Sequence, residues 1–194
     1  ALSPTGTEAT DMKRFDLMHA INARGTFLTT KLCIPHLRKS TNPHVLVLSP
    51  PLDLQPKWFK NHVAYSIAKY GMSLCVLGMA EEFRKDGIAV NALWPRTAIA
   101  TAAVANVLGR DLIAMSRTPD IMADAAHLML TQPSGALTGQ FVIDDSFLFE
   151  KGGITDFTPY RVDPSKPLVQ DFFVPDERPP PPGVEVIPLT LPGA

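Results

Sequence analysis

Tyr65 and Lys69 are the residues whose types and spacing point most directly to chemistry. They begin and end the stretch Tyr65-Ser66-Ile67-Ala68-Lys69, so a helix would place the phenol and the ammonium on one face. A free phenol, with a pKa of about 10, exchanges protons poorly at neutral pH. A neighbouring cation stabilises the phenolate and lowers that pKa, which allows proton exchange with an alcohol or a carbonyl. Alone, the pair fits a surface helix pair equally, because such a spacing arises easily by chance.

Three further positions could complete a site with that pair. Asn22 lies inside a predicted helix, where asparagine is disfavoured. Ser49 follows a predicted strand, at the edge where open α/β sheets bind ligands, and Pro95 ends the next strand in the same way. Singly, each has a structural explanation: a buried amide, a turn residue and a strand stop. Their order and spacing together favour a site.

The elements that must position these residues alternate between helices and strands. Three segments have the apolar spacing of helices: 11–38, 62–85 and 120–130. Short apolar runs bounded by turn residues predict strands at 45–48, 88–93 and 139–144, the first of them buried on both faces. Residues 97–117 are expected to be partly helical. Strands that alternate with helices predict an α/β fold with a parallel sheet.

Composition and charge exclude several other classes of protein. The chain has 194 residues, 45% of them apolar, and a formal net charge of −1, so we expect no binding to nucleic acid or to an anionic membrane. No run approaches the roughly 18 uncharged apolar residues that a membrane-spanning helix needs. The two cysteines form no cluster with histidine, which argues against a metal site and favours a reducing, cytoplasmic compartment.

Proline divides the chain unevenly. Of 19 prolines, seven fall in the last twenty residues. Such a segment cannot hold a helix, because proline lacks the backbone donor and clashes with the preceding turn. We therefore expect residues 1–174 to form the folded part, and residues 175–194 to be a disordered or extended, polyproline-like tail.

Four motifs, taken in order, resemble the short-chain dehydrogenase/reductase family. They are Asn22-Ala23-Arg24-Gly25-Thr26, a strand ending at Ser49, the stretch from Tyr65 to Lys69, and Val90-Asn91-Ala92-Leu93-Trp94-Pro95. The resemblance extends over about residues 1–175. It implies a Rossmann-like, doubly wound parallel sheet and reversible hydride transfer between NAD or NADP and a carbonyl or an alcohol.

The resemblance also implies a role for each matching residue. Tyr65 would be the acid–base residue, and Lys69 would bind the nicotinamide ribose and tune the phenol. Asn22 would hold a water relay behind Lys69, and Ser49 would polarise the substrate carbonyl. The cofactor itself would be lined by Pro95, Thr97, Ile99 and Thr101.

The expected partners follow from the same resemblance. The substrate would be a small carbonyl or alcohol compound, and apolar side chains after Ser49, such as Trp58 and Phe59, suggest that it is apolar. The two long helices are those that pair across subunits in the family, which implies a homodimer or a homotetramer.

Three departures from the family pattern leave an alternative open. Pro50 stands where the family usually has the catalytic serine, and Arg96 replaces a glycine and is expected to be exposed and solvated. No G-x-x-x-G-x-G turn occurs, and the strands match only the last three of a larger sheet. We expect the C-terminal portion of the family fold. The alternative is a catalytically inactive fragment or an oligomerisation module.

Overall fold

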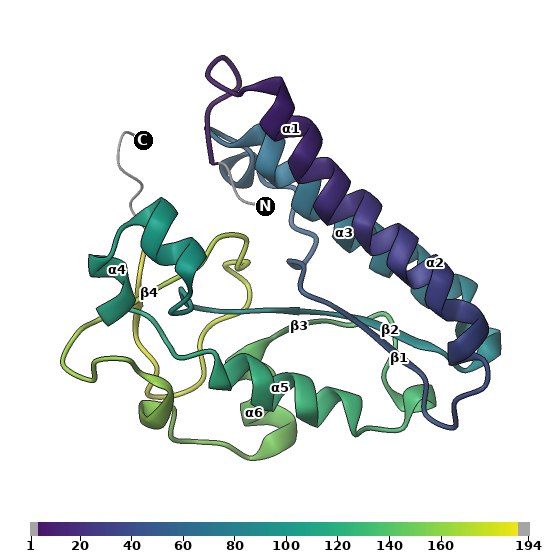
Figure 1. The fold of residues 1–194 in the computed structure, drawn as a ribbon. Helices are drawn as coiled ribbons and strands as arrows, with labels where there is room; N and C mark the ends of the chain where they lie inside the picture. The colour runs from purple at the N-terminus through teal and green to yellow at the C-terminus, as the bar shows by residue number, and fades with distance from the viewer. Residues whose placement is uncertain (1–3, 190–194) are drawn as a thin grey trace. The chain divides into compact units, whose positions relative to one another are not determined.

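The computed structural model describes residues 4–189 and divides the chain into two compact units. The first unit contains the residues up to Ala92 together with Leu130–Phe141. The second unit contains Leu93–Met129 and the residues from Val142 onward. Each unit is described by itself below, and Figure 1 traces the elements along the chain.

The first unit begins with one continuous helix built from three parts. They are α1 (Met12–His19), a π-helical turn (Ala20–Arg24) and α2 (Gly25–Leu37). The Asp11 carboxylate accepts a hydrogen bond of 3.1 Å from the Arg14 amide and so caps the first turn. The helix expected over 11–38 is therefore confirmed, and the π-helical turn lies where asparagine disfavours a regular helix.

The second long helix is α3 (Val63–Glu82), followed by a 3₁₀ turn (Arg84–Asp86). Gly87 has a φ of 71°, a left-handed conformation that glycine adopts without steric cost, so it ends the element. By length and composition alone, α3 is the one helix within residues 4–189 that could cross a bilayer. Half of the apolar 18-residue stretch in α3 is buried inside the protein, as in the core helix of a globular domain.

The sheet has the order β1 (His44–Val47), β2 (Ala89–Trp94) and β3 (Phe141–Ile143). β1 and β2 are parallel, with Val45 opposite Val90. The expected parallel sheet is thus confirmed for this pair. Burial differs from expectation, since β1 lies at the edge of the sheet and Leu48 just after it is 51% exposed. Side chains from α2, α3, β1 and β2 form the core: Ile34, Val47, Val76, Met79, Ala80, Ile88, Val90 and Ala92.

The second unit is built around shorter elements. They are α4 (Asp111–Ala114), α5 (Asp120–Leu130), whose last residue belongs to the first unit, α6 (Asp144–Gly152), β4 (Leu168–Val169) and β5 (Val186–Ile187). Single turns complete the two units: Pro56–Trp58, Val104–Leu108, Ser134–Ala136 and Thr158–Tyr160. The helix expected over 120–130 and the partly helical segment within 97–117 are confirmed.

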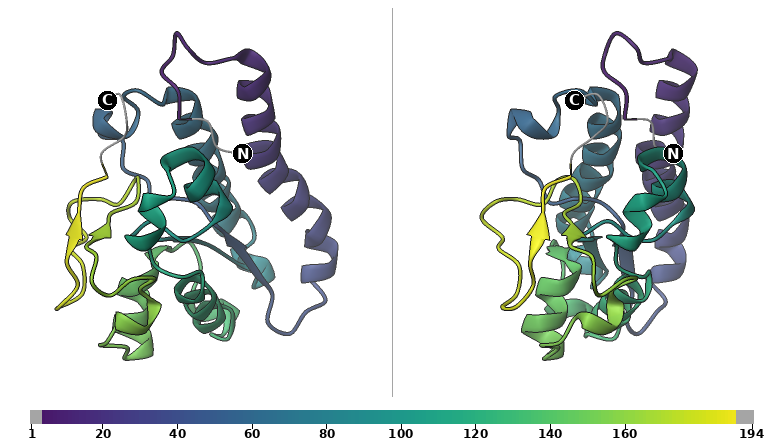
Figure 2. Two further views of the ribbon diagram at one scale, coloured as in Figure 1. Left: turned by 60° about the vertical axis from the view of Figure 1, so that its left-hand side comes forward. Right: turned by 90° about the vertical axis from the view of Figure 1, so that its left-hand side faces the viewer.

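The C-terminal segment differs from the expected disordered tail over the part that the structure describes. Figure 2 shows β5, in yellow, beside β4, and the two strands pair in parallel. The Gln170 amide donates to the Ile187 carbonyl at 2.8 Å. Prolines flank this pair but do not interrupt it, so the ladder keeps its donors. Residues 190–194 lie outside the described residues, and the expected domain boundary after residue 174 stays a prediction.

Candidate functional site

Tyr65 and Lys69 lie in the first two turns of α3, one turn apart on the same face. The Tyr65 side chain is buried, and Lys69 is half-buried. The Lys69 ammonium donates to the backbone carbonyl of Leu48 at 3.1 Å. This bond ties the helix that carries the phenol to the residues at the end of β1.

Ser49 sits between two backbone carbonyls that α3 binds. Lys69 contacts Leu48 on one side, and the Ser73 hydroxyl donates to the Pro50 carbonyl at 2.7 Å on the other. Ser49 is fully buried, and its hydroxyl has no hydrogen-bond partner within residues 4–189. A buried hydroxyl without a partner costs free energy in the folded state. The hydrogen-bonding capacity of the Ser49 hydroxyl is therefore unused within the described residues.

Asn22 lies in the π-helical turn between α1 and α2, and its side chain is buried. Its backbone carbonyl accepts a hydrogen bond from the Gly25 amide. The neighbouring Ala23 packs against Gly71 of α3, where an added Cβ would lie 2.9 Å from the Ala23 Cβ. The four residues expected to be catalytic, Asn22, Ser49, Tyr65 and Lys69, thus all belong to the first unit, on α3 and on segments that contact it.

A second face of α3 holds the segment between Pro50 and His62, which sequence reasoning missed. The Tyr70 hydroxyl donates to the Asp53 carbonyl, and the Ser66 hydroxyl donates to the Trp58 carbonyl. Burial raises the pKa of Tyr70 to about 12, so it stays a neutral donor. Together with Ser73, these residues have the spacing i, i+4 and i+7, which marks one helix face. This spacing was the signal in the sequence that could have revealed the second face.

His62 completes this second face just before α3. Its Nδ1 lies 2.9 Å from the Ser66 hydroxyl oxygen. Because Ser66 gives its only proton to the Trp58 carbonyl, His62 must donate at Nδ1. Burial lowers the pKa of His62, which favours the neutral ring. The segment before α3 is therefore fixed by neutral hydrogen bonds.

The four residues expected to line a cofactor belong to the second unit and follow β2. Pro95, Thr97 and Ile99 are buried, whereas Thr101 is exposed. The Thr97 hydroxyl donates to the Ala98 carbonyl at 3.3 Å. The Thr97 hydroxyl is therefore engaged inside the unit, whereas Thr101 offers an exposed hydroxyl.

Arg96 is not the solvated side chain that the sequence suggested. It is 1% exposed, and its Nε donates to both carboxylate oxygens of Asp145 at 2.7 and 2.8 Å. Its Nη2 donates to the Ser146 hydroxyl, and its Nη1 to the Arg178 carbonyl. A buried arginine requires such partners. They lie about fifty residues or more further along the chain, where no local pattern reveals them.

Two further charged residues join this buried group. Arg117 donates to Asp145 at 3.0 Å, and both side chains are fully buried. Asp144 accepts from the Arg96 amide at 2.9 Å. Burial, reinforced by the charge of Asp145, raises the pKa of Asp144 to about 7, although Arg117 opposes the shift. The group is thus a compact electrostatic junction at the start of α6.

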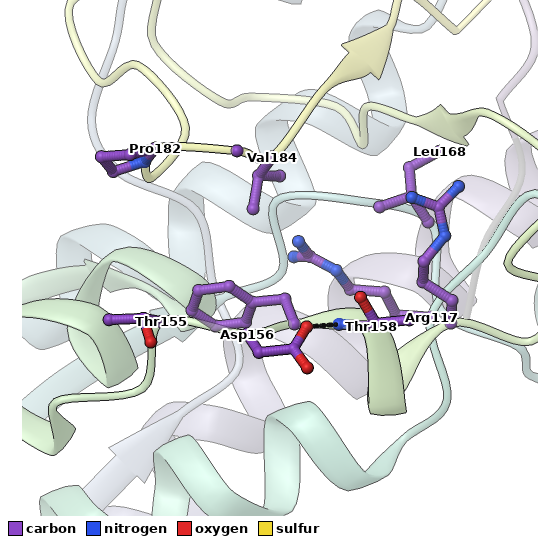
Figure 3. Close-up of a pocket in the computed structure, with 10 residues that line it drawn as sticks. Arg117, Thr155, Asp156, Thr158, Leu168, Pro182 and Val184 are labelled. Atoms are coloured by element: carbon purple, nitrogen blue, oxygen red, sulfur yellow. Dashed lines mark hydrogen bonds between the residues drawn. The ribbon is translucent and has the colours of Figure 1, made fainter.

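A pocket of about 80 Å³ lies beside this junction, within the second unit. Figure 3 shows Pro182 and Val184 across from Asp156 and Thr158, with the Asp156 carboxylate accepting from the Thr158 amide. Arg117 also lines the pocket, and its Nε and Nη2 have no partner within residues 4–189. The C-terminal segment therefore forms one wall of a polar pocket.

Comparisons with known proteins show that this chain is similar to proteins described as dehydrogenases and reductases. A family model described as "Enoyl-(Acyl carrier protein) reductase" matches residues 2–146. Hydroxysteroid dehydrogenase-like protein 2 of Danio rerio is 61% identical over 174 residues, which are 90% of this chain and 41% of that protein. The chain thus spans less than half the length of this curated relative.

Two solved structures share the fold at substantial identity. A protein of Xanthomonas campestris described as a "putative dehydrogenase" is 50% identical with a TM-score of 0.87, over 91% of this chain and 64% of that one. A short chain dehydrogenase from Mycobacterium thermoresistibile is 46% identical with a TM-score of 0.84, over 96% of this chain and 65% of that one.

Proposed function

Because the chain belongs to the short-chain dehydrogenase/reductase family, we propose that its first unit carries the acid–base site of an NAD(P)-dependent oxidoreductase. The substrate would be an apolar carbonyl or alcohol compound. The observation that supports this most directly is the contact between Lys69 and the Leu48 carbonyl. It joins the helix of Tyr65 to the residue before Ser49, whose hydroxyl has no partner within residues 4–189.

Each residue of the site would perform one step of proton handling. In the reductive direction, the Tyr65 phenol gives its proton to the carbonyl oxygen, and in the oxidative direction the phenolate removes the alcohol proton. The Lys69 cation favours the phenolate. The Ser49 hydroxyl donates to the same substrate oxygen and holds it in place. Asn22 would support a water relay behind Lys69.

The donor set fits a nicotinamide dinucleotide, which supplies or accepts the hydride when bound. The Lys69 ammonium, which also donates to the Leu48 carbonyl, would bind a ribose diol, and Thr101 offers an accessible hydroxyl after β2. Pro95, Thr97 and Ile99 would line the cofactor through their backbone and apolar surface. Both NAD and NADP share the parts that these residues would contact. The cytoplasm remains the compartment that the sequence predicts.

We also propose that the protein assembles as a homodimer or a homotetramer through its long helices. Large apolar side chains are exposed along both of them: Leu17, Ile21, Phe27 and Leu32 in the first helix, and Ile67, Leu74 and Leu77 in α3. Exposed apolar surface of this kind marks an interaction site. The same surface supports the second candidate function, a non-catalytic oligomerisation module, which is also compatible with the lack of a G-x-x-x-G-x-G turn.

A binding experiment separates the two functions. The longest natural form of the protein and the 194-residue chain are each titrated with NADH and NADPH, following nicotinamide fluorescence. The oxidoreductase requires binding of at least one nucleotide by the longest form, at micromolar concentration or below. If that form is folded and binds neither, the oxidoreductase is excluded and the oligomerisation module stands.

A further inference from the structure

The segment that follows β2 is held on both sides by backbone hydrogen bonds. On one side, the Ala98 amide donates to the Val169 carbonyl at 2.9 Å, and the Asp171 amide donates to the Arg96 carbonyl at 2.8 Å. On the other side, the Arg117 amide donates to the Ala98 carbonyl at 3.0 Å. Residues 96–98 thus form the middle of a small irregular ladder.

The C-terminal segment forms a second layer outside this ladder. Gln170, which bridges to Thr97, donates its amide to the Ile187 carbonyl at 2.8 Å. The Arg178 carbonyl accepts from Arg96 Nη1, also at 2.8 Å. Both the ladder and the Arg96 side chain are therefore connected to residues beyond 174.

Arg96 connects the backbone of this segment to the start of α6. Its amide donates to Asp144, and its guanidinium forms a two-oxygen contact with Asp145. The side chain is thereby directed into the unit, so a long cation occupies a position where the family pattern has a glycine. The planar guanidinium donates in three directions, from Nε to Asp145, from Nη2 to Ser146 and from Nη1 to Arg178, a spread that a lysine ammonium cannot reproduce.

We propose that Arg96 and residues 168–187 together form a brace that positions residues 95–101 for the nicotinamide cofactor. Arg96 is a positioning residue in this brace, because its side chain donates hydrogen bonds to Asp145, Ser146 and Arg178. The inference rests on the proposed function, which assigns Pro95, Thr97, Ile99 and Thr101 to the cofactor. A segment fixed before binding loses less conformational freedom when the cofactor binds.

Two variants of the longest natural form test the brace. Arg96→Lys keeps the charge and removes this three-way set of hydrogen bonds, because one ammonium nitrogen cannot reach all three partners. Deletion of residues 184–194 removes β5 and leaves the Arg96 side chain with all of its partners, so it serves if Arg96→Lys does not fold. The control deletes only residues 190–194.

Hydrogen–deuterium exchange and cofactor binding are measured together. We expect the Ala98 amide to exchange at least about tenfold faster in both variants, and the Kd for the nicotinamide to rise by about tenfold. The kcat at saturating cofactor should change by less than about threefold, because the acid–base residues are untouched. Exchange in α3 reports on the first unit and should stay unchanged.

Two results would overturn the brace while the oxidoreductase stands. One is a wild type that binds the cofactor and folded variants that bind it equally well. The other is faster exchange spread evenly over α3 and residues 95–101, which indicates loss of global stability rather than a local brace. A folded wild type that binds neither nicotinamide overturns the proposed function, and the brace with it.

Discussion

Gly71 of α3 lies against Ala23 of the π-helical turn so closely that a Cβ on Gly71 would stand 2.9 Å from the Ala23 Cβ. Real Cβ atoms do not come this close to each other, so a side chain here would push apart the two helices that carry Asn22 and Tyr65. The two helices contact each other closely here because Gly71 has no side chain, and not because apolar side chains are buried between them.

Gly71→Ala should therefore destabilise the protein, although alanine favours helices. We expect the free energy of unfolding to fall by about 1–3 kcal/mol, measured by urea denaturation. Gly78→Ala is the matched control, because nothing lies within 4 Å of an added Cβ at this position of the same helix. It should gain up to about 1 kcal/mol. Equal effects of the two variants would contradict the close packing.

Tyr65→Phe should abolish carbonyl reduction while leaving the fold intact. Losing the acid–base hydroxyl should lower kcat by about 10²–10⁴-fold, measured with the longest natural form of the protein. Tyr160→Phe is the control, because the Tyr160 hydroxyl binds the exposed Asp124 carboxylate in the second unit. Substantial turnover by Tyr65→Phe would remove Tyr65 from the mechanism.

Ser49→Ala should reduce turnover with little change in stability. The hydroxyl has no partner to lose within the described residues, yet removing one donor to a reacting oxygen typically costs about 10²–10³-fold in kcat. Ser73→Ala gives the contrasting stability result. It breaks a buried bond to the Pro50 carbonyl and should lower the free energy of unfolding by about 1–3 kcal/mol. A Ser49→Ala enzyme with unchanged kcat would show that another group binds the substrate oxygen.

Lys69→Gln should move the pH profile of kcat/KM toward higher pH. Without the cation, the phenolate of Tyr65 is less stable, so the basic form that removes the alcohol proton appears only at higher pH. The oxidative reaction reports this directly. Lys60→Gln, at an exposed position before α3, should leave the profile in place. An unshifted profile for Lys69→Gln would mean that Lys69 does not tune the phenol.

Asp144 should make stability fall as the pH rises. Burial raises its pKa from 3.8 to about 7 in the folded protein, so the folded state keeps a proton that the unfolded chain has already lost. The stability contributed by this group is complete below the unfolded pKa and is lost as the pH rises through the folded one. Urea denaturation from about pH 4 to about pH 8, a range that includes both pKa values, measures the slope.

Asp144→Asn keeps an oxygen for the Arg96 and Asp145 amides and cannot ionise. The free energy of unfolding of this variant should change less with pH over the same range. The comparison isolates Asp144 from the other charges of the junction: Arg96, Arg117 and Asp145. A slope that survives the substitution would assign the pH dependence to another group.

Local patterns were sufficient to predict the long helices and the three main strands. The apolar run of α3 and the stops at Gly87 and Pro95 are local in sequence, and so is the spacing of Tyr65 and Lys69. Asn22 disfavours a regular helix, which agrees with the π-helical turn found there.

The junction around Arg96 could not be predicted in this way. Asp145 and Arg178 become its partners only after the chain has folded, because they lie far from it in sequence. β4 and β5 have two residues each, too few for a periodic pattern, and a proline-rich composition hides the second of them. Burial of Arg96 and order in the C-terminal segment are therefore tertiary properties.

The π-helical turn has a consequence for how this helix tolerates changes in length. Met18 and Asn22 before or within it, and Thr30 and Ile34 after it, are all buried. A regular α-helix advances by about 100° per residue, so the wider turn takes up one residue and resets the angular phase between the two pairs. Losing one residue there would restore a regular helix with Thr30 and Ile34 still on the buried face, whereas gaining one would turn them away from the core by about 100°. Related chains should therefore be able to lose one residue at this turn without losing the contacts of the two buried pairs.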